Sequence, residues 1–215
     1  MILIKKKKEP SEWTKYRLTP GVDYQAMPAL VNALYEEQGY ICAFCMRRIP
    51  CNDSGTNEDH HVEHLLSRKN HDDKKLDYSN MVVCCPGHIG DEDHCDRKKG
   101  EKDISFSPTD SNFIDTVSYS NDGKIKSSIE LYDKELNEIL NLNTKLLVHN
   151  RRSMIKEIAS QFQSFTKAHK TLSKGLVNNL IHKYSNMRNT DGKLKYVEYC
   201  GVAIYYLQKK LNKMA

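Results

Sequence analysis

The chain has 215 residues, 39% of them hydrophobic and 28% charged, which is the composition of a globular protein with one or two domains. Its 33 Lys and Arg residues against 28 Asp and Glu leave a formal charge of +5, a mild excess that fits a phosphate-rich partner without by itself indicating one. No apolar run approaches the roughly 20 residues that span a bilayer, and the chain begins with apolar residues followed by charges, the reverse of a secretory signal, so we expect a cytoplasmic protein with no membrane partner.

The first part of the chain, residues 1–39, is expected to form an N-terminal arm and one helix. Residues 1–22 contain Pro and Gly breakers and are interpreted as irregular or extended. Asp23 is a candidate cap for a helix over 24–38, where apolar residues recur at helical spacing, and Gly39 is a natural stop for it.

Residues 40–104 are expected to form a unit held together by a metal ion, because about 60 residues bury too little apolar surface to be stable alone. In a cytoplasmic protein, clustered cysteines are more typical of metal ligands than of disulfides. Cys42 and Cys45 have the spacing of a zinc knuckle. Cys51 and Cys200 lack partners at ligand spacing and are interpreted as non-ligands.

The second pair of zinc ligands should come from three downstream cysteines. Cys84 continues an apolar strand, and alternation along a strand turns Cys84 and Cys85 to opposite faces, so we choose Cys85 and Cys95. The segment between them also holds His88 and His94, either of which could replace one thiolate. Four ligands leave no position for a substrate, so this zinc is expected to be structural.

Residues 105–128 are expected to be a connector that contains a β-hairpin. Two short runs of strand-forming residues between 113 and 125 flank the turn sequence Asn121-Asp122-Gly123.

From residue 129 to 215 the apolar spacing becomes helical. Breaks near Gly175 and across 189–192 predict at least three helices, the last of them over roughly 195–213.

An ordered set of polar residues lies inside the metal-binding unit (residues 40–104). Glu63 and His64 end one expected strand, Asn80 precedes a second strand, and Asp96 follows Cys95 at the start of a short helix. Strand, loop, strand and helix with these residues in these places resemble the HNH, or ββα-metal, nuclease superfamily. The resemblance implies an α+β chain with a zinc-clipped ββα-metal core. It further implies that His64 is the general base, that Asn80 orients the loop and the catalytic His, and that Glu63 and Asp96 bind the catalytic cation.

The chemistry of phosphodiester hydrolysis fits these residue types. Water attacks an anion, so a base must take a proton while a cation steadies the developing charge. His64 suits the base because an imidazole titrates near neutral pH. The carboxylate of Asp96 is a hard ligand suited to Mg²⁺ or Mn²⁺, and His94 is a second candidate for that metal.

Several neighbouring residues have two readings. His60 and His61 are either neighbours of the site or solvated strand residues. Arg97, Lys98 and Lys99 either contact phosphates or form a solvated surface.

The match narrows further outside the HNH residues. The run EEQGYICAFC at 36–45 and the ending HCDRKKG at 94–100 resemble the PtuB-type HNH proteins, over about residues 25–155. That resemblance implies a role in anti-phage defence, as in Septu systems and some retrons. The implied partners are a PtuA-like ATPase and, in the retron case, a reverse transcriptase with its non-coding RNA/DNA.

Two function classes follow. The first is a metal-dependent endonuclease acting on DNA or on a structured RNA such as a tRNA, because the acid–His–Asn order has no use in a pure binding protein. The second is a non-catalytic, zinc-stabilised nucleic-acid-binding module, which the cysteines alone support equally well.

Overall fold

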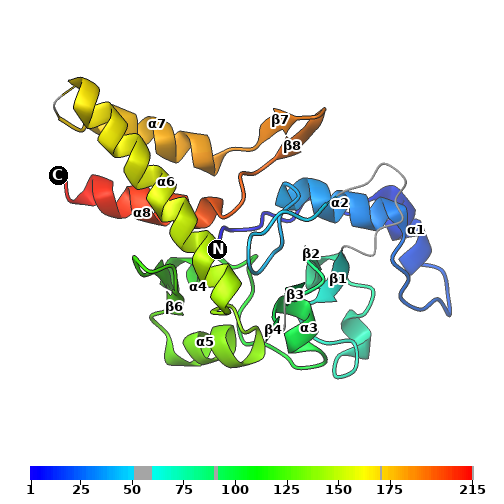
Figure 1. The fold of residues 1–215 in the computed structure, drawn as a ribbon. Coiled ribbons are helices and arrows are strands. Elements are labelled where there is room, and N and C mark those ends of the chain that lie inside the picture. The colour runs from blue at the N-terminus through cyan, green and yellow to red at the C-terminus, as the bar shows by residue number, and fades with distance from the viewer. Residues whose placement is uncertain (51–59, 90–91, 170, 215) are drawn as a thin grey trace.

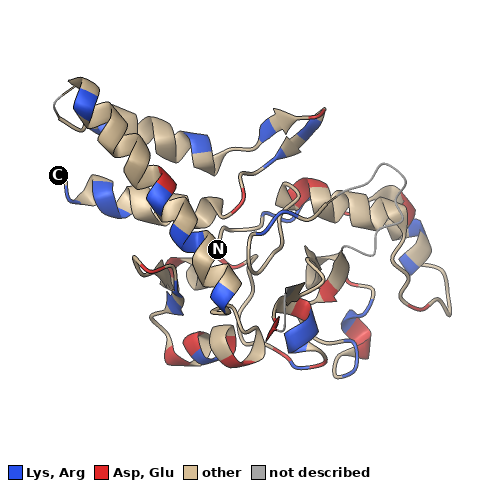
Figure 2. Ribbon diagram, viewed as in Figure 1, with Lys and Arg blue, Asp and Glu red and all other residues tan. Residues whose placement is uncertain are grey.

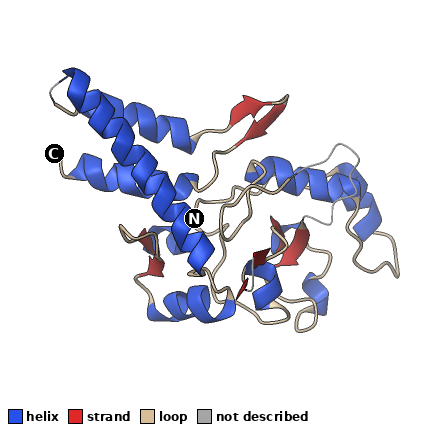
Figure 3. Cartoon of the chain, viewed as in Figure 1, coloured by secondary structure: helices blue, strands red, loops and turns tan. Residues whose placement is uncertain are grey.

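The computed structural model describes residues 1–50, 60–89, 92–169 and 171–214 (Figure 1). The protein is an α+β fold in which helices predominate and the described strands form small antiparallel pairs (Figure 3). The predicted fold class is therefore confirmed at the level of α+β. Among the described residues, no helix combines the length and the apolar character needed to cross a membrane.

The N-terminal arm contains a helix that the sequence did not predict. Residues 1–22 were expected to be irregular, but α1 (Ser11–Arg17) forms directly after Pro10. Its Trp13 is fully buried and packs against Tyr16 and Tyr24. Seven residues carry too few apolar positions to show a helical period, so tertiary packing of Trp13 explains the helix.

The second helix, α2 (Pro28–Gln38), starts later than the predicted 24–38. Proline has no backbone N–H to donate and favours the first helical position, while the residue before it is held extended, as Met27 is. The predicted stop is confirmed, because Gly39 is left-handed with φ 57°. A side chain there would collide with the backbone of Tyr196.

The metal-binding unit contains a hairpin followed by a short helix. Strands β1 (His61–His64) and β2 (Met81–Cys84) pair antiparallel, with His64 opposite Met81. The loop between them contains two short 3₁₀ turns, η1 (Asp72–Lys74) and η2 (Tyr78–Asn80). The helix α3 (Cys95–Lys99) follows and ends at Gly100, so the predicted strand–loop–strand–helix order is present. Cys51 lies outside the described residues.

The insertion between Cys85 and Cys95 forms a second small hairpin. Strands β3 (His88–Ile89) and β4 (Glu92–Asp93) pair antiparallel. This brings the fourth cysteine back towards the other three in space.

The connector contains the predicted hairpin, but in a shorter form. Strands β5 (Val117–Tyr119) and β6 (Ile125–Ser127) pair around residues 121–123. The first predicted run was too long, because residues 111–116 form the helix α4 (Ser111–Thr116), which is capped by Asp110.

The C-terminal region is helical, as expected, with one additional hairpin. It begins with α5 (Glu130–Lys134), which continues into the π-helical η3 (Glu135–Ile139). The long helix α6 (Lys145–His169) and α7 (Lys174–Ser185) follow, so the break lies just before Gly175.

The break predicted at 189–192 is the turn of a hairpin between β7 (Arg188–Thr190) and β8 (Lys193–Lys195). Asp191 and Gly192 both have positive φ, as a two-residue hairpin turn requires. The last helix, α8 (Cys200–Asn212), starts later than predicted because β8 and the following loop occupy its expected first residues.

One continuous core joins the metal-binding unit to the C-terminal helices. The backbone N–H of Tyr199 donates to the carbonyl of Met46 at 3.1 Å, and that of Cys95 donates to Leu140 at 2.8 Å. Glu37, an acid buried in α2, accepts a hydrogen bond from Tyr78 at 3.0 Å and pairs with Lys6 of the arm. The arm, the metal-binding unit and the helical region therefore support one another.

Candidate metal centre and active-site cleft

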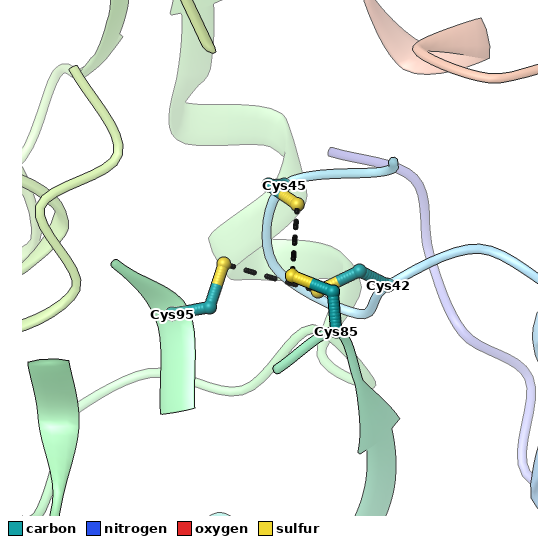
Figure 4. Close-up of side chains that lie close together, drawn as sticks. All are labelled: Cys42, Cys45, Cys85 and Cys95. Atoms are coloured by element: carbon teal, nitrogen blue, oxygen red, sulfur yellow. Dashed lines mark hydrogen bonds between the residues drawn. The ribbon is translucent and has the colours of Figure 1, made fainter. Parts of the chain in front are cut away.

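Four cysteines from three separate segments meet in the core (Figure 4). The sulfur of Cys42 lies 3.9 Å from that of Cys95, and the sulfur of Cys45 lies 3.7 Å from that of Cys85. All four sulfurs lie within 4.8 Å of one another and are buried. A tetrahedron of sulfurs at 2.3 Å from a zinc ion has edges of about 3.8 Å, so these residues fit a structural zinc.

The backbone explains why these four sulfurs converge. The Cys42 N–H donates to Arg47 at 2.9 Å and its carbonyl accepts from Met46 at 3.0 Å, which closes the knuckle turn. Met46 and Cys95 both have positive φ, at 63° and 52°. The fixed left-handed backbone at Cys95 places the fourth sulfur opposite the knuckle.

The alternatives to this ligand set lie next to it rather than in it. Cys84 is fully buried in β2 but outside the cluster, as strand alternation predicted. The Nδ1 of His94 lies 3.1 Å from the sulfur of Cys95, so the His94 imidazole contacts a ligand from outside the cluster.

A cleft of about 1020 Å³ lies beside β1 and α3, away from the zinc cluster. It is lined by Glu63, His64 and Asp96, and on the opposite side by Tyr24 and α2. Three of the predicted site residues therefore share one cavity, whereas His94 is not among its lining residues.

His64 is held in one orientation by two contacts. Its Nε2 donates to the carbonyl of Lys75 at 3.0 Å, because a carbonyl can only accept. The ring of Tyr24 meets the imidazole edge-on at 4.7 Å between centroids. Burial lowers the pKa of His64 to about 4. The neutral ring thus carries its proton on Nε2, which leaves Nδ1 able to accept one.

Asn80 fixes the loop that supplies this carbonyl. Its Oδ1 accepts from the N–H of Leu66 at 2.8 Å, and its Nδ2 donates to Leu66 at 3.0 Å and Lys74 at 3.2 Å. Asp103 adds a second anchor by accepting from the N–H of Ser67 at 2.8 Å. The side chain of Asn80 therefore closes the β1–β2 loop next to Lys75.

Replacing Asn80 with Ala should loosen this loop and lower the free energy of unfolding by roughly 3 kcal/mol, because three buried backbone groups lose their partner. Chemical denaturation measures the effect. An Asn178→Ala variant, altered on the exposed face of α7, is the matched control and should change stability by less than about 0.5 kcal/mol. Equal stability of the two variants would show that Asn80 does not hold the loop.

Two carboxyl groups and two basic groups meet at the floor of the cleft. Lys99 pairs with Glu63 at 2.5 Å and donates to the carbonyl of His64 at 3.1 Å. His61, on the same face of β1 as Glu63, pairs with Asp96. Of the two readings left open for each, His61 is thus a site neighbour, and Lys99, only 1% exposed, is not a surface residue.

The electrostatics of this cluster favour a bound cation. Burial raises the pKa of Glu63 to about 9 and the nearby carboxyl of Asp96 adds to the shift, whereas Lys99 opposes it. The ion pair with Lys99 is therefore too weak a compensation for a charged Glu63 at this depth. With His61 neutral, two carboxylates face one ammonium group, and a divalent ion would supply the missing positive charge.

The donor set at Glu63 and Asp96 fits Mg²⁺ or Mn²⁺, which bind through one or two carboxylates and keep several waters. Among the residues that the structure describes, the four cysteines are the only group of three or more His, Cys, Asp or Glu side chains close enough to surround one ion. A cation in the cleft would thus take the rest of its ligands from water or substrate.

Basic side chains line the same cleft. Arg68 stacks over Tyr24 at 4.7 Å, and Lys69, Lys75 and Arg97 reach other parts of the wall. Arg97 is exposed and pairs with Asp93 at 3.0 Å. Such a lining suits an anionic substrate.

A scan against protein-family models finds no match, and a search of curated proteins finds no significant one.

Proposed function

We propose that this protein is a metal-dependent endonuclease of the HNH type that hydrolyses phosphodiester bonds in DNA or in a structured RNA such as tRNA. The observation that carries the proposal is the state of His64. Its Nε2–H is committed to the Lys75 carbonyl, so Nδ1 is left as a proton acceptor in a cleft lined by two carboxylates and several cations. The β1, β2 and α3 order beside four clustered cysteines supports an HNH core.

The residues of the cleft divide the chemistry between them. His64 takes the proton of the attacking water at Nδ1, and the Lys75 carbonyl and the Tyr24 ring keep the imidazole aimed. Asn80 holds the loop that carries Lys75. Arg68, Lys69 and Arg97 bind and orient the phosphate backbone. A Mg²⁺ or Mn²⁺ ion held by Glu63 and Asp96 would stabilise charge on the phosphate and on the leaving oxygen.

Cation binding at these carboxylates can be measured independently of cleavage. Mn²⁺ at about 100 times its dissociation constant should stabilise the folded protein by about 2.7 kcal/mol, which is a rise in Tm of roughly 5–10 °C. Glu63→Gln and Asp96→Asn should each abolish the rise and the cleavage of DNA and RNA. Asp115→Asn, an exposed carboxylate on α4, is the control and should keep both. A rise that survives in both cleft variants would place the cation elsewhere.

The second candidate is a zinc-stabilised nucleic-acid-binding module with no catalysis, which the cysteine cluster and the basic cleft also fit. The two functions differ in what Glu63 and His64 do. In a binding module, substitution of either leaves the biological effect intact, whereas loss of the cysteines removes it.

The biological setting that we propose is anti-phage defence, with a PtuA-like ATPase as partner and possibly with a retron reverse transcriptase and its nucleic acid. It rests on the resemblance of runs 36–45 and 94–100 to PtuB-type proteins. Co-purification of the chain with the product of a neighbouring ATPase gene, and loss of phage resistance in a His64→Ala strain, would support it. Full resistance in that strain would refute it.

A further inference from the structure

Charge is distributed very unequally along this chain. Residues 141–215 contain 14 Lys and Arg against 3 Asp and Glu, a formal charge of +11, whereas residues 1–140 contain 19 against 25, a charge of −6. The mild overall excess of +5 therefore conceals a strongly basic C-terminal region. Among its described basic residues, Arg151 alone is buried.

The helix α6 carries part of this charge in a single line. Lys145, Arg152, Lys156 and Lys167 are all exposed and are separated by 7, 4 and 11 residues. At 3.6 residues per turn, they fall within about 60° of one another around the helix and extend over about 33 Å. Figure 2 shows basic residues along the length of α6. We call these four residues the α6 basic stripe.

The stripe is not neutralised by the protein itself. Within the described residues from 141 to 214, the ion pair of Lys195 with Asp191 at 3.5 Å is the only one, and it lies in the β7–β8 hairpin. The opposite face of α6 is buried in the core through Leu147, Ile158 and Phe162. The four cations therefore project into solvent from a rigid support.

The surface around the stripe is that of a polyanion site rather than of a protein-docking site. Protein interfaces have an apolar, aromatic-rich centre. In the described part of 141–215, the exposed large hydrophobic residues are Leu146 and Leu194, and they lie on different elements. A row of cations without an apolar centre matches a nucleic-acid backbone, in which one strand places a charge every 3.4 Å or so.

The stripe begins beside the metal-binding unit. The backbone N–H of Lys145 donates to the carboxylate of Glu92 at 3.1 Å, and Asn141 donates to the carbonyl of Asp93 at 2.8 Å. Both acceptors lie on β4, within four residues of Asp96. A backbone that follows α6 therefore ends close to the helix that carries Asp96.

From these observations we infer that the α6 basic stripe is a docking surface for the phosphate backbone of a nucleic acid, separate from the cleft. The inference concerns how the proposed nuclease holds its substrate and in that sense rests on the proposed function. A stripe of about 33 Å can follow roughly ten nucleotides. Such contacts confer affinity and salt dependence, not sequence preference.

The test compares three full-length variants in a His64→Ala background, which prevents cleavage. The stripe variant carries Lys145→Gln, Arg152→Gln, Lys156→Gln and Lys167→Gln. The matched control loses the same charge at four exposed lysines outside the C-terminal region, by Lys5→Gln, Lys8→Gln, Lys102→Gln and Lys126→Gln. The third variant keeps the charge of the stripe, with Arg at its three lysines. Fluorescence anisotropy at several salt concentrations follows binding of a tRNA, a single-stranded DNA and a duplex DNA.

The stripe variant should lose on the order of 100-fold in affinity for the best of the three probes at about 0.1 M salt, and its salt dependence should fall by up to about 0.9 per lost phosphate contact. The control and the Arg variant should stay within about threefold of the parent. Equal losses in the stripe and control variants would overturn the inference, as would unchanged binding or a parent that binds none of the probes. Binding through the stripe with no cleavage by the wild type would instead refute the nuclease while leaving the docking surface in place.

Discussion

Replacing Cys42 with Ser is expected to unfold the metal-binding unit and to weaken the rest of the chain. Zinc binding to a four-cysteine site is worth on the order of 10 kcal/mol or more, which is comparable to the whole stability of a domain. The effect should spread because the knuckle holds the C-terminal helices through Met46 and Tyr199, and because Cys95 is bonded to Leu140. Removing one thiolate therefore removes the support of both halves.

Metal analysis and thermal unfolding measure this effect. The wild type should contain one zinc ion per chain, and strong chelators should lower its Tm by tens of degrees. Cys200→Ala, which removes another buried cysteine that lies outside the cluster, is the control and should keep its zinc. A zinc-free wild type with an unchanged Tm would disprove the structural role of the cluster.

The second large effect is expected at His64. Loss of a positioned general base slows a reaction by roughly 100- to 10,000-fold, so His64→Ala should reduce single-turnover cleavage by that amount. The variant should still bind nucleic acid and Mn²⁺, because Glu63, Asp96 and the basic residues are unchanged. His182→Ala, at an exposed histidine on α7, is the matched control and should cleave like the wild type.

The pH dependence follows from the direction of the His64 shift. A base works only when it is unprotonated, and the pKa of His64 is lowered by burial to about 4. Protonation of His64 should therefore not slow cleavage above about pH 5, and the rate should fall only as the pH approaches 4. Cleavage by His64→Ala at the wild-type rate would show that another group is the base.

The sequence predicted the residues of the candidate site well because their chemistry is local. Cys42 and Cys45 are close in the chain, and the choice of Cys85 over Cys84 followed from the alternation of one strand. Asn80 was expected to orient the loop, and the structure places it across both ends of the segment from Leu66 to Lys74. Patterns that act over a few residues can be read without coordinates.

Other site residues could not be found in this way, because their role depends on contacts between elements. Lys99 looked like one of three basic surface residues, but it turns inward to Glu63 when α3 packs on β1. Tyr24 lies 40 residues before His64, and nothing in the sequence relates the two rings. His61 had two open readings until its contact with Asp96 decided between them.

The sequence by itself determined the order of the elements, the zinc ligand set and the α+β class, since apolar periodicity, cysteine spacing and glycine stops are written locally in the chain. Only the tertiary structure decided where helices α1, α2 and α8 begin, and which charges are buried. Those outcomes depend on the free energy of packing Trp13, Lys99 and Tyr199 against distant segments, and a side chain acquires that energy only once the fold has brought its partners together.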